Sequence, residues 1–476
     1  MVEALEVDLC VIGGGSGGLT VAAGAAQMGA KTVLFERAKM GGDCLNYGCV
    51  PSKALLAAGH AAAHYGQSGV FGIEGGPARV AFDKVNDHVR GVIAEIAPHD
   101  SVGRFEELGV RVIQEAARFT GRREVTGSGG TRVRARRFVI ATGSSPAVPP
   151  IPGLDTIDYL TNETVFDLRA CPEHLIVIGG GPIGMEMAQA HRRLGARVSV
   201  LEALEIMGPD DRELVAVVRA RLVQEGVEIH EGAAVQSVEK SGDGVAAIIQ
   251  RDGAPQRIEG SHLLVAAGRR PNLEGLDLDV AGVVHSRKGI DVDKRLRTAN
   301  KRIFAIGDVA GPYQFTHVAG HHAGIVIRNA LFRLPAKVKY HAVPWVTYTD
   351  PELANVGLTE AKARERFGDA VRVVTASFAE NDRALAERRT EGFVKVVIGR
   401  GGRILGAGIV GYHAGELLQP WILAIGQRLK IGAMAGIIAP YPTMGEINKR
   451  AAGNYFTPSL FSERTRRIVR LLARLG

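Results

Sequence analysis

Two cysteines, Cys44 and Cys49, have the residue type and the spacing that redox chemistry at sulfur requires, within the run GGDCLNYGCVPSK at positions 41–53. On a regular helix, residues five positions apart differ by about 140° around the axis, and their Cα atoms lie roughly 9 Å apart. A disulfide needs Cα atoms within about 6.8 Å, so a bridge here requires a distorted backbone, which Gly48 permits. A strained, accessible disulfide is more easily reduced than a structural one. The pair is therefore a candidate redox-active disulfide, and the alternative is two unrelated buried thiols.

Two segments far apart in the chain have the same pattern: an apolar strand, G-x-G-x-x-G, a helix, and a second strand that ends in a carboxylate. The carboxylates are Glu36 and Glu202, each about 20 residues beyond its glycines. Glycines allow the backbone to approach a pyrophosphate at a helix N-terminus, and the carboxylate accepts a hydrogen bond from a ribose hydroxyl. One such pattern is weak, but two in the correct context predict two dinucleotide sites. The predicted contacts are Gly13, Gly15, Ser16 and Gly18 in the first segment and Gly179, Gly181 and Gly184 in the second.

Further strand and turn signals divide the rest of the chain. The runs FVIATGS (138–144) and LLVAAGR (263–269) each end in a glycine turn, and the Pro-rich segment 146–152 is a natural domain crossing. A third strand, IFAIGD (303–308), ends in Gly-Asp, and from about His341 the runs are typical of an antiparallel sheet with helices between. The predicted fold class is therefore α/β, with two Rossmann-like dinucleotide-binding domains followed by an α+β domain. The predicted boundaries are 1–148, 149–270, 271–340 (a second part of the first domain), 341–461, and a tail at 462–476.

The composition excludes several classes of protein. A content of 46% hydrophobic and 23% charged residues is typical of a globular protein, and four cysteines are too few for an extracellular disulfide framework. Residues 1–15 have no secretory signal pattern, and the best apolar run, 421–441, is interrupted by charged residues. We therefore expect a cytoplasmic protein. The net charge of +8 comes from scattered basic residues, and without a nucleic-acid-binding motif it predicts no nucleic-acid partner.

Taken together, these motifs resemble those of the flavin-dependent class I pyridine nucleotide-disulfide oxidoreductases over nearly the full length of the chain. The resemblance depends on the cysteine run, both dinucleotide patterns, ATGS at 141–144, AIGD at 305–308 and PYPTMGE at 440–446, in this order. It is strongest to the branch of dihydrolipoamide dehydrogenases and mercuric reductases. It implies a homodimeric enzyme in which residues 341–461 form the dimerisation domain.

The resemblance also assigns the two dinucleotide sites. It implies FAD on the first pattern, with Glu36 on the adenosine ribose and Asp308 on the ribityl chain, and NAD(H) on the second pattern. Glu202 favours NADH over NADPH, because a carboxylate repels a ribose 2′-phosphate, and Ala203 and Leu204 supply no arginine to bind one. A solvated turn acid is the alternative for Asp308. The other implied cofactor contacts are Gly42, Lys53, Ala117, Thr142, Gly143, Gly268, Thr316 and His317.

For the two cysteines the resemblance implies different roles. Cys49 is expected to face the flavin as a charge-transfer thiolate, and Cys44 to be the interchange thiol that attacks the substrate. Only a thiolate is nucleophilic, and a nearby positive charge lowers the pKa of a thiol. Lys53 matches a lysine beside the reactive edge of the flavin, and Glu186 matches its carboxylate partner, since a buried charge needs a counter-charge. The alternative is a solvated lysine and a helix-surface acid.

The C-terminal motif departs from that of the disulfide-reducing relatives. In those enzymes a His before Pro-Thr, supplied by the other subunit and followed by a Glu, moves a proton to and from the interchange thiol. Here Glu446 is kept, but Tyr441 replaces the His. A phenol titrates near pH 10 and an imidazole near pH 6.5, so Tyr441 cannot exchange protons freely at neutral pH. It can donate a hydrogen bond to a thiolate, and the alternative is a core aromatic at the dimer interface.

Mercuric reductases also have a Tyr at this position, but they end in a vicinal cysteine pair, and residues 461–476 contain no cysteine. The predicted activity is therefore electron transfer between NAD(P)H, FAD, the Cys44–Cys49 disulfide and a small-molecule or protein disulfide or dithiol, as in dihydrolipoamide dehydrogenases. One alternative is reduction of Hg²⁺ or another metal ion, although no resident metal site is expected. Another is a redox-relay partner of a protein or membrane complex.

Two further features are interpreted as structural. His321, His322 and His413 are predicted to be solvated or capping residues. The tail has basic and apolar residues at helical spacing, and such a helix packs more often on its own protein than on an anionic membrane, which is the alternative. The basic residues are Arg464, Arg466, Arg467, Arg470 and Arg474, and the apolar ones are Ile468, Leu471, Leu472 and Leu475.

Overall fold

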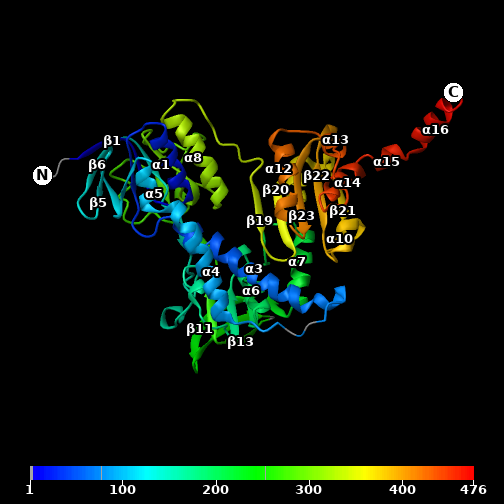
Figure 1. Cartoon of the computed structure of the whole chain (residues 1–476), viewed down its shortest axis with the longest axis horizontal. Helices are drawn as coiled ribbons and strands as arrows, with labels where there is room; N and C mark the ends of the chain where they lie inside the picture. Colours follow the sequence, from blue (N-terminus) through cyan, green and yellow to red (C-terminus); the bar gives the residue numbers. More distant parts are fainter. Residues whose placement is uncertain (1–3, 75, 77, 252, 476) are drawn as a thin grey trace. The chain divides into compact units, whose positions relative to one another are not determined.

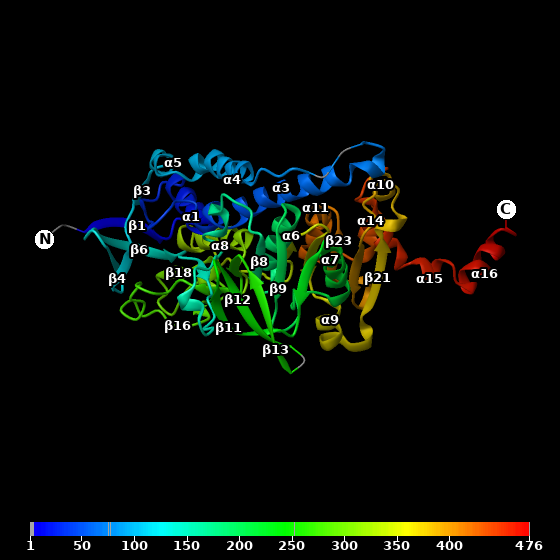
Figure 2. The ribbon, with the colours of Figure 1, turned by 90° about the horizontal axis from the view of Figure 1, so that it is seen from below.

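The computed structural model describes residues 4–74, 76, 78–251 and 253–475 of the 476-residue chain. The described residues form two compact units, one within 1–203 and 230–338 and the other within 204–229 and 339–476. Figures 1 and 2 show the helices and strands of both units in two orientations, coloured along the sequence. The boundaries predicted between the two dinucleotide-binding domains remain predictions.

The first unit contains a seven-stranded sheet built around β1 (Leu5–Ile12). β1 pairs in parallel with β2 and with β6, and β18 pairs in parallel with β6. Its strand order is β3-β2-β1-β6-β5-β4, and α1 connects β1 to β2 as the crossover that parallel strands require. The other elements here are β2 (Thr32–Phe35), β3 (Val110–Ile113), β4 (Ala117–Gly121), β5 (Glu124–Gly127), β6 (Arg132–Ile140), β18 (Ile303–Ala305), α1 (Ser16–Gln27) and α8 (Thr316–Ala330).

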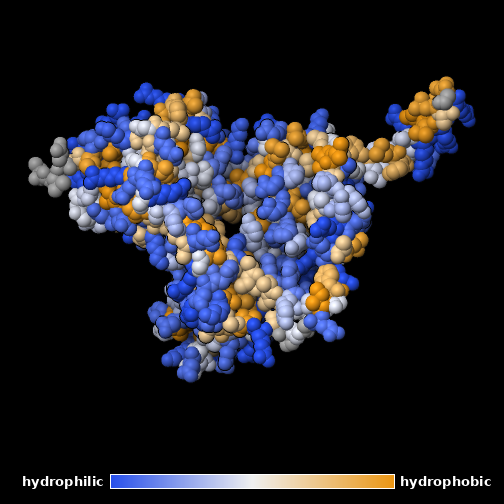
Figure 3. Space-filling model, in the orientation of Figure 1, coloured by the Kyte–Doolittle hydropathy of each residue, from blue (hydrophilic) through white to orange (hydrophobic). Residues whose placement is uncertain are grey.

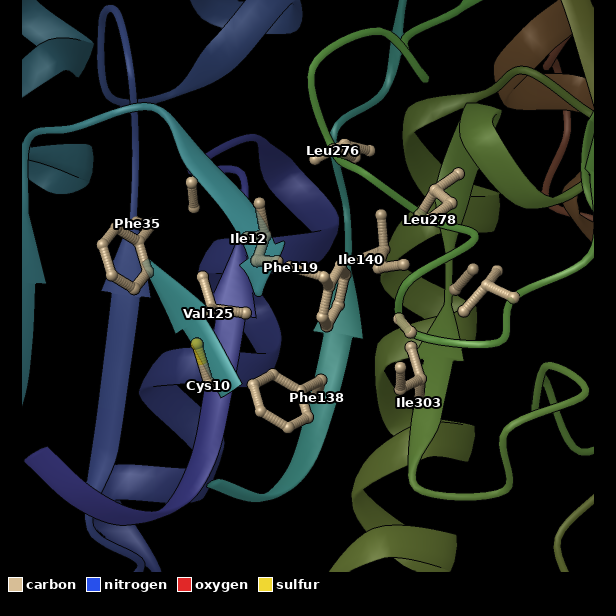
Figure 4. Packing of buried hydrophobic residues seen from close by; sticks show 14 of the residues in the cluster. Cys10, Ile12, Phe35, Phe119, Val125, Phe138, Ile140, Leu276, Leu278 and Ile303 are labelled. Atoms are coloured by element: carbon tan, nitrogen blue, oxygen red, sulfur yellow. The ribbon is translucent and has the colours of Figure 1, made fainter. Parts of the chain in front are cut away.

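Both faces of this sheet are buried, and alternate residues of β1 point to opposite faces. On one face, Leu9 and Val11 pack with side chains of α1 and α8. On the other face, Cys10 packs with Phe119 and Phe138, whose ring centroids lie 5.5 Å apart (Figure 4). Burial on both sides explains why β1 ends in an unbroken apolar run. It also makes Cys10 an inert core thiol, because desolvation raises its pKa.

A second parallel sheet in this unit has β8 (His174–Ile178) between β9 (Arg197–Leu201) and β14 (His262–Val265). α6 (Pro182–Arg193) follows β8 as α1 follows β1, so the two segments that share a sequence pattern fold alike. The prediction of two Rossmann-like domains is therefore confirmed. The other elements are β7 (Ser144–Pro146), β11 (Ala234–Ser241), β12 (Gly244–Arg251), β13 (Ala254–Gly260), β15 (Arg269–Pro271), β16 (His285–Ser286), β17 (Gly289–Ile290), α2 (Gly42–Asn46), α3 (Cys49–Gly66), α4 (Phe82–Ile96) and α5 (Val102–Glu107). The strand β10 (Val227–His230) is divided between the residues of the two units.

The second unit is an antiparallel sheet with helices, as the sequence predicts for its C-terminal part. The strands lie in the order β19-β20-β23-β22-β21, and each neighbouring pair is antiparallel. Trp421 lies in its core, where the indole N–H donates to the Asn448 Oδ1 atom at 2.8 Å. The elements are α7 (Arg212–Gln224), β19 (Pro344–Thr347), β20 (Glu352–Gly357), α9 (Glu360–Phe367), β21 (Arg372–Ser377), α10 (Asp382–Ala386), β22 (Phe393–Ile398), β23 (Ile404–Gly411), α11 (Ala414–Leu417), α12 (Gln419–Gly426), α13 (Ile431–Ala435), α14 (Glu446–Asn454), α15 (Thr457–Leu460) and α16 (Glu463–Leu472).

Candidate active site

The two glycine patterns form the same turn. Gly13 and Gly179 adopt φ values of +107° and +112°, which side chains rarely tolerate. A Cβ atom on Gly18 would lie 1.9 Å from the Gly13 carbonyl oxygen, and one on Gly184 would lie 2.0 Å from that of Gly179. In both segments the last glycine therefore allows the helix to pack closely on the strand.

The carboxylates at the ends of the second strands are held in the same way. Glu36 Oε2 accepts from the Gly14 N–H at 2.6 Å, and Glu202 Oε2 accepts from the Gly180 N–H at 2.7 Å. A Cβ atom on Gly181 would meet no atom of the described residues, its chain neighbours aside, within 4 Å, so packing against these residues does not require a glycine there. A glycine there allows the protein backbone to approach a pyrophosphate closely, and this geometry fits a dinucleotide on each segment.

The backbone changes direction between the two cysteines. Cys44 lies in α2 and Cys49 is the first residue of α3, and Gly48 between them has φ −125° and ψ −114°, outside the helical and strand regions. A Cβ atom on Gly48 would lie 2.9 Å from Asp43 Oδ2. The break in the helix that the spacing requires is therefore present, and a glycine makes it.

The pKa values of the two thiols are shifted in opposite directions. The hydrogen bond from Cys44 lowers the pKa of the Cys49 thiol to about 6, and the Thr316 hydroxyl and the Lys53 charge act in the same direction against desolvation. The same hydrogen bond raises the pKa of Cys44, with desolvation as the next cause. Cys49 Sγ lies 3.5 Å from Thr316 Oγ1 on α8. In the dithiol form at neutral pH, the proton therefore stays on Cys44 and Cys49 carries the negative charge.

Lys53 and Glu186 form an ion pair with Nζ and Oε2 2.7 Å apart. Their side chains are 36% and 6% exposed, so Lys53 is partly solvated, but the alternative of a helix-surface acid at Glu186 is wrong. α3 packs against α6 (Figures 1 and 2), and Gly59 allows this close contact, since a Cβ atom there would already lie 3.4 Å from the Ala190 Cα atom. The pair thus joins the helix that begins at Cys49 to the helix of the second glycine pattern.

A partly buried network connects Asp308 to the cysteine loop. Ser144 Oγ donates to Asp308 Oδ2 at 2.6 Å, and Arg269 Nε donates to the same hydroxyl at 2.7 Å. Arg269 Nη2 lies 3.2 Å from the carboxylate of Asp43, the residue before Cys44. Burial raises the pKa of Asp308, although the hydrogen bond from Ser144 and the charge of Arg269 oppose this. Asp308 is thus no solvated turn acid.

Sequence reasoning did not identify Asp43, Ser144, Arg269 or Asn162 as site residues. Asn162 Nδ2 donates to Asp43 Oδ1 and to the Tyr47 carbonyl oxygen, both at 3.1 Å, and so holds the loop between the cysteines. The sequence contained two signals for these residues. Asp43 lies next to Cys44, and Arg269 follows the glycine that ends the 263–269 strand.

Of the three histidines predicted to be solvated or capping, His321 and His413 are exposed, but His322 is buried. It lies on α8, and its Nδ1 atom accepts from the Gly307 N–H at 3.2 Å. Desolvation lowers the pKa of His322 to about 4, so the imidazole is neutral at pH 7 and can accept this bond. It thereby fixes the turn that presents Asp308. His317 stacks on Phe315, with ring centroids 5.3 Å apart.

Tyr441 and Glu446 lie in the second unit. The Tyr441 side chain is 71% exposed, and its hydroxyl donates to Asp382 Oδ2 at 2.9 Å. This hydrogen bond raises the pKa of Tyr441 above the usual value of a phenol. Tyr441 therefore stays protonated at neutral pH. Glu446 Oε2 accepts from the Thr443 N–H at 3.4 Å at the start of α14.

Comparison with known proteins decides the family. The profile of the pyridine nucleotide-disulphide oxidoreductases matches residues 7–323, and that of their dimerisation domain matches residues 343–452. The chain belongs to this family. The protein is thus an FAD-dependent pyridine nucleotide-disulfide oxidoreductase, an enzyme that uses FAD and NAD(P)(H) and acts on sulfur groups. The dimerisation domain supports the predicted homodimer.

Relatives within this family have two different names. The chain is 36% identical over 455 residues to a mercuric reductase of Streptomyces lividans, covering 94% of this chain and 96% of the relative. It is 34% identical over 456 residues to a dihydrolipoyl dehydrogenase of Geobacillus stearothermophilus, with coverage of 94% and 96%. Among solved structures, LpdA from Mycobacterium tuberculosis has a TM-score of 0.86 at 26% identity, covering 94% of this chain and 100% of that one. The flavoprotein disulfide reductase RclA from Escherichia coli has a TM-score of 0.83 at 27% identity, with coverage of 94% and 99%.

None of the described helices combines the length and the hydrophobicity that crossing a bilayer requires.

Proposed function

We propose that this oxidoreductase exchanges an electron pair between NADH and a disulfide or dithiol substrate through Cys44 and Cys49. FAD, when bound, supplies two-electron transfer between the nicotinamide and the cysteine sulfurs. Gly13, Gly15, Glu36 and Asp308 would hold FAD, and the second glycine pattern with Glu202 would hold NADH. The observation that carries the proposal is the pair of thiols of opposite acidity beside the Lys53–Glu186 ion pair.

The sulfur chemistry follows from this difference in acidity. Cys44, once deprotonated, attacks one sulfur of the substrate disulfide, forms a mixed disulfide and releases the first substrate thiolate. The Cys49 thiolate then attacks Cys44 Sγ, which releases the second thiolate and closes the Cys44–Cys49 disulfide. Two electrons have then passed from the cysteine pair to the substrate, and the released thiolates take up protons. Oxidation of a dithiol with NAD⁺ is the reverse of these steps.

A steady-state screen tests this proposal. Lipoamide, glutathione disulfide, Hg²⁺ with excess thiol, and quinones would each be offered to the holoenzyme with NADH and with NADPH. We expect turnover of a disulfide, a preference for NADH, and loss of disulfide turnover in both Cys44→Ser and Cys49→Ser. Turnover of quinones alone that survives both substitutions would contradict the proposal.

A second candidate function is the reduction of a thiolate-bound metal ion such as Hg²⁺. It is favoured by Tyr441, because a protonated phenol is a poor proton shuttle and a metal ion bound by thiolates needs none. In the same screen, catalytic NADH oxidation with Hg²⁺ would support this candidate, and stoichiometric inhibition without turnover would reject it.

A further inference from the structure

The C-terminal helix α16 presents an apolar surface that the described residues of its own unit leave uncovered. No side chain of α16, which is described over its whole length, is buried. Ile468, Leu471 and Leu472 are 47%, 61% and 57% exposed, and Phe461 just before the helix is 68% exposed. The apolar side of the helix therefore does not pack on the described residues of its own unit, although the sequence pattern favoured packing on the protein itself.

This helix has its own start signals. Ser462 Oγ accepts from the Thr465 N–H at 3.2 Å, so the side chain caps the first turn. Glu463 in that turn accepts from Arg466 at 3.0 Å. A carboxylate in the first turn also stabilises a helix through its interaction with the helix dipole. Helices of this length are marginal in water unless an apolar face is covered. A surface that covers the face of α16 would therefore stabilise it.

Three of the four arginines of α16 lie away from this apolar face, and the fourth, Arg464 in the first turn, falls within its arc. At 100° per residue, Ile468, Leu471 and Leu472 lie within an arc of about 100°, and Arg466 and Arg467, with Arg470, lie within a similar arc on the opposite side. Figure 3 shows hydrophobic and hydrophilic surface side by side on this C-terminal helix. The helix sequence ERTRRIVRLL has four arginines and one acid. A groove on another protein would need only the apolar face, whereas the excess of arginine calls for an anionic surface as well.

We propose that α16, with Phe461, binds the surface of an anionic phospholipid bilayer. The apolar face would enter the boundary between headgroups and acyl chains, and the arginines would contact phosphates. Guanidinium groups bind phosphate oxygens in bidentate fashion, and the long stems of these arginines allow them to extend from the opposite side of the helix toward the headgroups. One short helix binds weakly, but a homodimer carries two copies, and binding of the first raises the effective concentration of the second.

Co-sedimentation with vesicles tests this proposal on the holoenzyme. We expect sedimentation with vesicles of equal parts phosphatidylglycerol and phosphatidylcholine, and none with phosphatidylcholine alone. Each arginine near an anionic surface contributes about fivefold to binding, so Arg466→Gln, Arg467→Gln and Arg470→Gln combined should weaken it about 100-fold. Leu471→Ser with Leu472→Ser should also abolish binding, and high salt should weaken it.

The matched control replaces three exposed arginines elsewhere, Arg118, Arg134 and Arg136, by Gln. It has the same net charge as the tail variant and should retain vesicle binding. Equal losses in the two triple variants would overturn the proposal, because net charge alone would then explain binding. A change in dimer mass of either tail variant by light scattering would also overturn it, since the helix would then cover a second copy of the chain. Unchanged flavin absorbance and NADH reduction of the flavin in every variant would show intact folding.

Discussion

The Lys53 ammonium group lies 2.7 Å from the Glu186 carboxylate, and the two charges act in opposite directions on Cys49. Lys53 lowers the pKa of the Cys49 thiol, and Glu186 raises it. The hydrogen bond from Cys44 lowers it further and is the largest cause. The acidity of Cys49 is thus set by burial and by residues of α2, α3, α6 and α8, and the contribution of each residue can be removed separately.

Removing the thiol donor should raise the pKa of Cys49. In Cys44→Ala the hydrogen bond that lowers the pKa of Cys49 to about 6 is lost, so we expect the thiolate to form at a higher pH than with Cys44 present. Cys44→Ser is the matched control, because its hydroxyl can still donate, and its midpoint should lie below that of Cys44→Ala. The measurement is the long-wavelength absorbance of a thiolate beside oxidised flavin, titrated against pH. Identical midpoints in the two variants would contradict the assigned role of the hydrogen bond.

The members of the ion pair should shift the same titration in opposite directions. In the Cys44→Ser background, Lys53→Met removes a positive charge, so the midpoint for Cys49 should move to higher pH. Glu186→Gln removes a negative charge that lies close to the Lys53 ammonium group, so the midpoint for Cys49 should move to lower pH. Shifts of the same sign in both variants would mean that altered packing, rather than charge, controls the thiolate.

The sequence predicted the parts of the site whose geometry is local. The glycines of each pattern and the carboxylates Glu36 and Glu202 lie within one strand–helix–strand unit, so their spacing alone determines their contacts. Arg269 could not be found in this way, because its partners Asp43 and Ser144 come from distant segments that only the folded chain brings together.

His322 is a different case, because a signal was present in the sequence. It lies four residues after Val318 and four before Val326, both buried, and so occupies the apolar stripe of α8. Residue type suggested a solvated histidine, and helical periodicity was the better guide. The polar ring remains buried because the Gly307 N–H donates to it.

Arg269→Met should destabilise the protein. The Arg269 side chain is only 13% exposed and lies between the carboxylates of Asp43 and Asp308, which would lose a counter-charge and a hydrogen-bond network. Loss of hydrogen bonds to charged groups costs about 2 kcal/mol each, so we expect the free energy of unfolding to fall by roughly that amount or more. Arg270→Met, at the neighbouring position, is the control. Arg270 is exposed, and its guanidinium group pairs with the exposed Glu274. Its effect on unfolding in urea should stay within about 0.5 kcal/mol, and equal losses in the two variants would reject a structural role for the network.

Tyr441→His should raise the rate of lipoamide or glutathione disulfide reduction at neutral pH. We propose that position 441 of the other subunit faces Cys44, as the resemblance to this family implies. An imidazole there titrates near pH 6.5, so it could take the Cys44 proton and return it to the leaving thiolate. The hydrogen bond to Asp382 instead raises the pKa of the Tyr441 phenol further from neutrality. General acid–base catalysis contributes on the order of 10²-fold or more to a rate. The gain should disappear as the pH falls below the pKa of the imidazole, because the protonated ring cannot accept the proton. Tyr441→Phe separates the effect of the new base from loss of the phenol, and it should not increase the rate. If Tyr441→His gained nothing, or if Tyr441→Phe gained as much, proton transfer at this position would not be what limits disulfide reduction.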